Sequence, residues 1–121
     1  MTMEYLRELS EAISVSGDEG AARAIILKAI EGHVEDVKID SMGTITALKR
    51  GTDGANRPRV MLAAHMDEVG FMVTGWDSDG LIKFTSVGGI DDRILPGLRV
   101  KIGDNKLPGV ILWTPIHKNR D

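Results

Sequence analysis

One histidine and two carboxylates stand together near the middle of the chain, between two apolar runs. Residues 63–71 read AAHMDEVGF and contain His65, Asp67 and Glu68. In extended backbone, alternation would place His65 and Asp67 on one face and Met66 on the other. An imidazole that binds a divalent cation through one nitrogen commonly donates its other N–H to a carboxylate, which fixes the ring. His65 is therefore a candidate metal ligand, with Asp67 as its orienting carboxylate or as a further ligand.

The same triplet also fits a structural role, because so short a pattern is not specific by itself. His65 would then be a hydrogen-bonded histidine at the end of a strand, with Asp67 and Glu68 as turn residues. The context favours the metal site. The triplet follows an apolar run of strand length, and the ends of buried strands are where open α/β sheets bind ligands.

Two amphipathic helices are expected before this cluster. Apolar residues at three- and four-residue spacing predict a helix over residues 2–14, and a second apolar face predicts another that ends at Gly32. Ser16 and Glu19 have the spacing of a capping box. We expect them to cap the second helix rather than to take part in chemistry.

Short strands are expected in the rest of the chain. A change to period two predicts a hairpin over residues 34–49, with its turn at Asp-Ser-Met-Gly. The run VMLAA at residues 60–64 predicts a strand covered on both faces. Beyond residue 69, four short strand candidates alternate with Asp- and Gly-containing turns. The pattern predicts an α/β chain with a boundary near residues 66–70.

Several segments resemble the glutamyl-aminopeptidase and deblocking-aminopeptidase family of cocatalytic metallo-aminopeptidases, whose members often form tetrahedral dodecamers. AAHMDEVGFMV is the most specific, and SGDEGAAR, IDSMGTITA, LPGLRVKIG and the late GVI and PIH are also similar. The resemblance covers nearly all of the chain. It implies that residues 1–68 are the N-terminal part of a mixed-sheet metallopeptidase domain. Residues 69–121 would be part of a β-rich, barrel-like dimerisation insertion.

The resemblance also implies a site for two divalent metal ions, zinc or cobalt, with His65 as a ligand and Asp67 as the carboxylate that orients it. Glu68 matches the family's segment, and a salt-bridged structural carboxylate is the expected role. Family members are considerably longer, and the other ligands and the general base would lie beyond residue 121. One histidine cannot hold two metal ions. We therefore expect little or no peptidase activity from these 121 residues alone.

The other titratable candidates fit structural roles better. His33 follows the glycine expected to end a helix, and His117 lies in a polar segment that resembles part of the insertion. Asp91 and Asp92 are adjacent, so in a strand they would face opposite ways. We expect these two carboxylates to form turns.

Composition excludes several classes of function. The net charge of −3 and the scattered basic residues give no stripe for nucleic acid. The chain has no cysteine, which excludes thiolate ligands and is compatible with a reducing cytoplasm. Acidic and basic residues interrupt any apolar run near the N-terminus that a signal peptide or membrane span would need. We expect a cytoplasmic protein with no membrane partner.

The leading interpretation is an aminopeptidase acting on peptides, in which two metal ions polarise the scissile carbonyl and lower the pKa of a bound water. A second is a non-catalytic assembly module, or one part of a split enzyme, that forms homo-oligomers through the β-rich half, because exposed strand edges pair with other chains. A third is a glycoside hydrolase that uses Asp67 or Glu68 with Asp91 or Asp92. It ranks last, because aromatic residues are only 4% of the chain.

Overall fold

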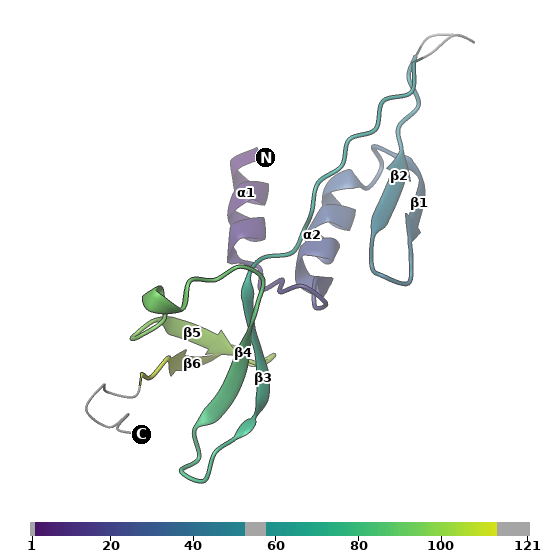
Figure 1. Ribbon diagram of the computed structural model, residues 1–121. Helices are drawn as coiled ribbons and strands as arrows, with labels where there is room; N and C mark the ends of the chain where they lie inside the picture. The colour runs from purple at the N-terminus through teal and green to yellow at the C-terminus, as the bar shows by residue number, and fades with distance from the viewer. Residues whose placement is uncertain (1, 53–57, 114–121) are drawn as a thin grey trace. The chain divides into compact units, whose positions relative to one another are not determined.

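The computed structural model describes residues 2–52 and 58–113, which form helices and short strands (Figure 1). The chain divides into two compact units, Met1–Gly88 and Gly89–Asp121. Within the described residues, the strands pair as three antiparallel hairpins, β1 with β2, β3 with β4 and β5 with β6. The predicted mixed α/β class is confirmed. The barrel-like insertion and its boundary at residues 68 and 69 stay predictions.

The two helices contact each other within the first unit. Helix α1 spans Thr2–Glu11 and helix α2 spans Gly20–Ile30, where Ala22 is buried. Helix α1 ends earlier than predicted because the N–H and C=O of Ser14 bond to Glu68 and are not available to continue the helix. Gly32 follows α2 with φ +72, the left-handed conformation common after a helix. No helix in residues 2–52 and 58–113 is long and apolar enough to cross a membrane.

The predicted capping box is wrong. Glu19 is the residue that precedes α2, and its side chain makes no cap hydrogen bond to the helix. Its Oε1 instead accepts the N–H of Gly17 at 2.6 Å. Ser16 Oγ donates to Asp67, because an ionised carboxylate is a strong acceptor and lies within reach of the hydroxyl.

Two of the hairpins share one kind of turn, and both were predicted. Asp40 Oδ1 accepts the main-chain N–H groups two and four residues later, both at 2.9 Å. Asp77 Oδ1 does the same at 2.9 and 2.8 Å. Gly43 and Gly80 supply the positive φ that each turn needs, +84 and +82. The strands are β1 Glu35–Ile39 with β2 Ile45–Leu48, and β3 Gly70–Trp76 with β4 Ile82–Val87.

The second unit contains the third hairpin and a short 3-10 helix. Strand β5 spans Arg99–Ile102, strand β6 spans Leu107–Val110, and the helix η1 spans Asp92–Ile94. Main-chain bonds extend the pairing, since Gly97 donates to Ile111 and Ile111 donates to Leu98, both at 2.9 Å. The side chains of Leu95 and Ile111 are the buried apolar core of this unit.

The predicted strand at residues 60–64 is not formed. These residues belong to no strand, and Val60, Met61 and Leu62 are 80, 88 and 94% exposed. A strand covered on both faces needs hydrogen-bonded neighbours and packed layers. None of the strands among the described residues pairs with this segment, so its apolar side chains remain in solvent.

Candidate functional site

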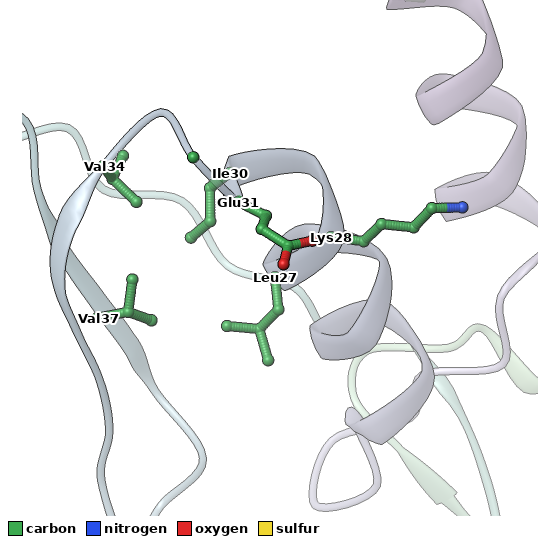
Figure 2. Close-up of a pocket in the computed structure, with 7 residues that line it drawn as sticks. Leu27, Lys28, Ile30, Glu31, Val34 and Val37 are labelled. Atoms are coloured by element: carbon green, nitrogen blue, oxygen red, sulfur yellow. The ribbon is translucent and has the colours of Figure 1, made fainter.

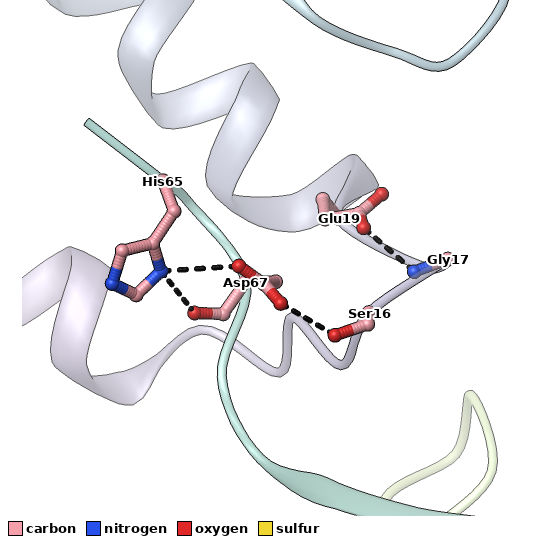
Figure 3. Close-up of polar contacts among 5 residues, drawn as sticks. All are labelled: Ser16, Gly17, Glu19, His65 and Asp67. Atoms are coloured by element: carbon pink, nitrogen blue, oxygen red, sulfur yellow. Dashed lines mark hydrogen bonds and ion pairs between the residues drawn. The ribbon is translucent and has the colours of Figure 1, made fainter. Parts of the chain in front are cut away.

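The side chains of His65 and Asp67 are in contact, as their spacing suggested (Figure 3). His65 Nδ1 lies 3.0 Å from Asp67 Oδ1 and 3.0 Å from the main-chain oxygen of Asp67. The imidazole itself is open to solvent, with 85% of its side chain exposed. The carboxylate of Asp67 is less open, at 38%. The contact therefore leaves most of the imidazole ring open to a ligand.

The two contacts of Nδ1 determine which ring nitrogen is available. A carbonyl oxygen and an ionised carboxylate can only accept hydrogen bonds, so Nδ1 must carry the proton that they share. In the neutral imidazole, Nε2 then holds a lone pair and no proton. This arrangement, which an orienting carboxylate produces in metal sites, leaves Nε2 as the ring nitrogen of His65 that could bind a cation.

Asp67 is bound on its other oxygen as well. Ser16 Oγ donates to Asp67 Oδ2 at 2.5 Å, from the loop between the two helices (Figure 3). This hydrogen bond, followed by the one from His65, lowers the pKa of the Asp67 carboxyl below its ordinary value. Asp67 is therefore ionised at neutral pH, as a group that accepts the Nδ1 proton of His65 should be.

The segment that carries His65 is fastened to the same interhelical loop. Glu68 donates its N–H to the Ser14 carbonyl at 2.8 Å, and Val15 and Glu68 form an isolated parallel bridge. Gly70 permits this approach, because a Cβ at that position would overlap the side chain of Val15. These contacts hold the interhelical loop and the His65 segment in a fixed alignment, although the two are far apart in sequence.

Glu68 makes a structural hydrogen bond in place of the expected salt bridge. Its Oε1 accepts the N–H of Ser14 at 3.3 Å, and no salt bridge to it is present among the described residues. Ser14 is itself 3% exposed, and its hydroxyl has no hydrogen-bond partner in the described part of the chain. The carboxylate of Glu68 therefore helps to secure the loop against the segment.

The described residues fit one ligand position of a metal site rather than a whole site. Among residues 2–52 and 58–113, no three His, Cys, Asp or Glu side chains come together in a group that could hold a metal ion. A catalytic zinc ion normally needs three protein ligands. With its proton on Nδ1, His65 could supply one nitrogen ligand.

The other residues considered from the sequence lie in local structure. Asp91 accepts the N–H of Arg93 at 3.0 Å at the start of η1 and pairs with the Arg93 guanidinium at 2.6 Å. These bonds lower the pKa of Asp91. Asp92 is the first residue of η1, and His33 follows α2, where its N–H bonds to the carbonyl of Ile30 at 3.0 Å. His117 lies outside the described residues.

A shallow pocket lies between the end of α2 and strand β1 (Figure 2). Its volume is about 370 Å³, and the apolar side chains from the helix face those of the hairpin, while Lys28 points away. The lining consists of Leu27, Lys28, Ile30, Glu31, Gly32, Val34 and Val37. It includes neither His65 nor Asp67, so the pocket is not part of the candidate metal site.

Ser16 is the residue of this site that sequence reasoning missed. Its acceptor lies 51 positions away, and its local context matches a helix cap. No spacing rule could connect it with Asp67, because such a contact depends on how two distant segments pack.

This chain is similar to several proteins named as aminopeptidases. A family model described as M42 glutamyl aminopeptidase matches residues 43–121. The lysyl aminopeptidase of Pyrococcus furiosus is 31% identical over 121 residues, which are 98% of this chain and 34% of that protein.

Solved structures show the same fold. The Pyrococcus horikoshii TET1 peptidase, which can assemble into a tetrahedron or a large octahedral shell, is 34% identical with a TM-score of 0.77, over 100% of this chain and 36% of that one. A Thermotoga maritima protein described as an endoglucanase is 47% identical with a TM-score of 0.80, over 92% of this chain and 34% of that one.

The chain spans about a third of the length of these proteins. The matches confirm the resemblance that the sequence motifs indicated. With the family model covering well over half of its residues, the chain belongs to the M42 glutamyl aminopeptidase family.

Proposed function

We propose that a longer polypeptide containing residues 1–121 is a metal-dependent aminopeptidase, which releases N-terminal residues from peptides. One observation carries this proposal: His65 Nδ1 lies 3.0 Å from two oxygens of Asp67 that can only accept, in an imidazole whose side chain is 85% exposed. Membership of the M42 family supports the reaction class. His65 would bind one of two zinc or cobalt ions. Residues beyond residue 121 would supply the remaining ligands and the general base.

When bound, such ions polarise the scissile carbonyl and lower the pKa of a water molecule. The residues of this chain have a more limited task. Asp67 accepts the Nδ1–H of His65 and keeps the ring in one tautomer and one orientation. Because Asp67 is ionised, it also adds electron density to the imidazole, which makes Nε2 a better ligand.

The proposed ligand can be tested in a full-length polypeptide, which would contain the remaining donors. Titration with zinc or cobalt, followed by two-dimensional ¹H–¹⁵N spectra of the imidazoles, should shift or broaden Nε2 of His65 before the other ring nitrogens. His65→Ala should remove this response, and His33→Ala is the matched control that should keep it. A response that survives in His65→Ala would place the metal elsewhere and contradict the assignment.

The activity needs a second measurement. A full-length polypeptide loaded with zinc or cobalt is expected to hydrolyse chromogenic aminoacyl substrates, and residues 1–121 alone are expected to show little or no turnover. Turnover by the 121 residues comparable with that of a full-length relative would contradict the proposed division of ligands. No turnover by the full-length polypeptide with any aminoacyl substrate would contradict the aminopeptidase itself.

We further propose that the protein forms homo-oligomers through its β-rich part. The assembly of the Pyrococcus horikoshii TET1 peptidase supports this for a relative. Strand β3 also exposes apolar side chains, among them Met72 at 57%, Val73 at 51% and Trp76 at 67%. Exposed apolar side chains on a two-stranded sheet favour association, because contact with a second chain would remove them from water.

The endoglucanase description of the Thermotoga maritima relative keeps a glycoside hydrolase as the alternative to test. Such an enzyme needs one carboxyl group with a raised pKa to act as the acid. Asp67 and Asp91 are held ionised by their hydrogen bonds to Ser16 and Arg93, which lower both pKa values. Neither suits the acid role. Hydrolysis of a soluble cellulose derivative by the full-length polypeptide, unaffected by a metal chelator, would favour this alternative over the peptidase.

A further inference from the structure

We infer that Ser16 is a positioning residue for His65, and that it acts by holding the carboxylate of Asp67 in place. The inference rests on the proposed role of His65 as a metal ligand. Ser16 Oγ and His65 Nδ1 bind opposite oxygens of one carboxylate, Oδ2 at 2.5 Å and Oδ1 at 3.0 Å. A carboxylate that accepts one hydrogen bond on each oxygen cannot rotate about its Cβ–Cγ bond without breaking one of them.

The exposure of these side chains explains why Ser16 is needed. The imidazole is 85% exposed and the carboxylate 38%, so neither ring nor carboxylate is fixed by close packing. An exposed aspartate with one hydrogen bond would exchange among rotamers that release Nδ1. The bond from Ser16 selects the rotamer in which Oδ1 faces the imidazole.

Ser16 is itself held independently of Asp67. The loop around it is closed by the bond from Asp18 N–H to the Val15 carbonyl at 2.8 Å and by the bond from Gly17 N–H to Glu19 at 2.6 Å. The two bonds between Ser14 and Glu68 fasten the same loop to the His65 segment. Ser16 therefore lies in a loop that other hydrogen bonds hold in place. Its hydroxyl can fix the side chain of Asp67, which would otherwise rotate freely.

The expected effect of removing the hydroxyl is partial. Nδ1 also has the main-chain oxygen of Asp67 at 3.0 Å, and that acceptor does not depend on Ser16. Loss of the hydroxyl should therefore weaken the preference for the proton on Nδ1 without abolishing it. Because Ser16 is exposed, Ser16→Ala leaves no cavity and should not unfold the chain.

The test reads the tautomer of His65 directly, in the 121-residue chain without metal. ¹H–¹⁵N spectra, recorded at a pH at which the ¹⁵N shifts show the neutral ring, give the ratio of Nδ1–H to Nε2–H. Ser16→Ala should lower this ratio by about threefold or more, because a hydrogen bond to a charged group is lost. Ser16→Thr keeps the hydroxyl and should restore the ratio.

Two controls separate positioning from a general structural effect. Ser10→Ala removes a serine hydroxyl that bonds to the Leu6 carbonyl within α1, and it should leave the His65 tautomer unchanged. Ser16→Ala added to Asp67→Ala should cause no further change, because Ser16 acts only through that carboxylate. An unchanged ratio in Ser16→Ala, or a further change in the double variant, would overturn the inference.

Zinc titration of the same variants distinguishes this inference from the proposed function. If His65 is a ligand, Ser16→Ala should weaken zinc binding about threefold to tenfold, less than loss of the orienting carboxylate itself. If zinc does not bind His65 in a full-length polypeptide but Ser16→Ala still shifts the tautomer, the proposed ligand fails and the positioning remains. If zinc binds His65 and the tautomer does not respond to Ser16→Ala, the positioning fails alone.

Discussion

Ser14 and Glu68 are joined by two hydrogen bonds, one from the Glu68 N–H to the Ser14 carbonyl at 2.8 Å and one from the Ser14 N–H to the Glu68 carboxylate at 3.3 Å. The pair connects the loop between the helices to the segment that carries His65. It sets the register in which Ser16 lies opposite Asp67, so the orientation of the imidazole depends on the stability of this connection.

Gly70→Ala should open this connection. The new Cβ would overlap the side chain of Val15, and overpacking of this kind typically costs about 1–3 kcal/mol. Hydrogen exchange at the Glu68 N–H, which bonds to Ser14, should therefore speed up by about fivefold to 150-fold. Val15→Ala in the same chain removes the overlapping methyl groups and should restore much of the protection.

Gly20→Ala is the control for that substitution, because no atom lies within 4 Å of a Cβ at Gly20. It should leave the exchange of the Glu68 N–H unchanged. Equal acceleration in both variants would mean that the close approach of Val15 does not stabilise the connection.

In a full-length polypeptide, Asp67→Asn should weaken the binding of zinc by about tenfold to 100-fold, the usual effect of replacing the carboxylate behind a histidine ligand. The neutral amide attracts the Nδ1 proton less and can no longer accept on both atoms. Zinc titration followed by the Nε2 resonance of His65 measures the change. Asp18→Asn alters a nearby carboxylate that does not contact His65 and should leave the affinity unchanged; equal effects would exclude a specific role for Asp67.

The parts of this chain that were predicted correctly are those encoded within a few residues. The turns at Asp40 and Asp77 form because each carboxylate bonds to N–H groups two and four residues later, and a nearby glycine adopts positive φ. Such contacts need nothing beyond the hairpin itself. Alternation predicted the strands beside the Asp40 turn, and short apolar runs bounded by turn residues predicted those beside Asp77.

The errors concern contacts that the local sequence does not contain. Residues 60–64 have the composition of a buried strand, but burial depends on neighbours that the described residues do not supply. Ser16 matches a cap in its own segment, yet a carboxylate 51 positions away accepts its proton. The pairing of His65 with Asp67 was predictable because the two are only two residues apart.

The β1–β2 hairpin should lose stability in acid. The N–H of Thr44, and then that of Met42, lowers the pKa of Asp40 below its ordinary value of 3.8. A group whose pKa is lower in the folded state stabilises that state above its unfolded pKa, and the effect is lost as pH falls through the folded pKa. Exchange protection of the Thr44 N–H should therefore be constant from neutral pH down to about pH 5 and should decrease below about pH 4.

Asp40→Asn keeps an acceptor oxygen but cannot ionise, so its hairpin should be less protected at neutral pH and should show little change in acid. Exchange must be compared after correction for the intrinsic pH dependence of the chemical rate. A hairpin in the unchanged chain whose corrected protection does not vary down to about pH 2 would contradict the role given to the Asp40 carboxylate.

Association of the chain should depend on strand β3. Replacing Met72 and Trp76 by serine removes two exposed apolar groups and should shift the species seen by size exclusion with light scattering toward the monomer. Leu6→Ser removes an apolar group of similar exposure, 58%, from α1 and is expected to have no effect. A chain that is strictly monomeric at high concentration would contradict association through the β-rich part.

The connection between the interhelical loop and the His65 segment would form before the rest of the proposed metal site. Every group that orients the imidazole lies at or before Gly70, within the first compact unit. A ribosome releases these residues before any that follow, and N-terminal regions can fold while synthesis continues. An incoming cation would therefore meet a donor atom whose direction is already set, so little additional ordering of this part of the chain would accompany metal capture.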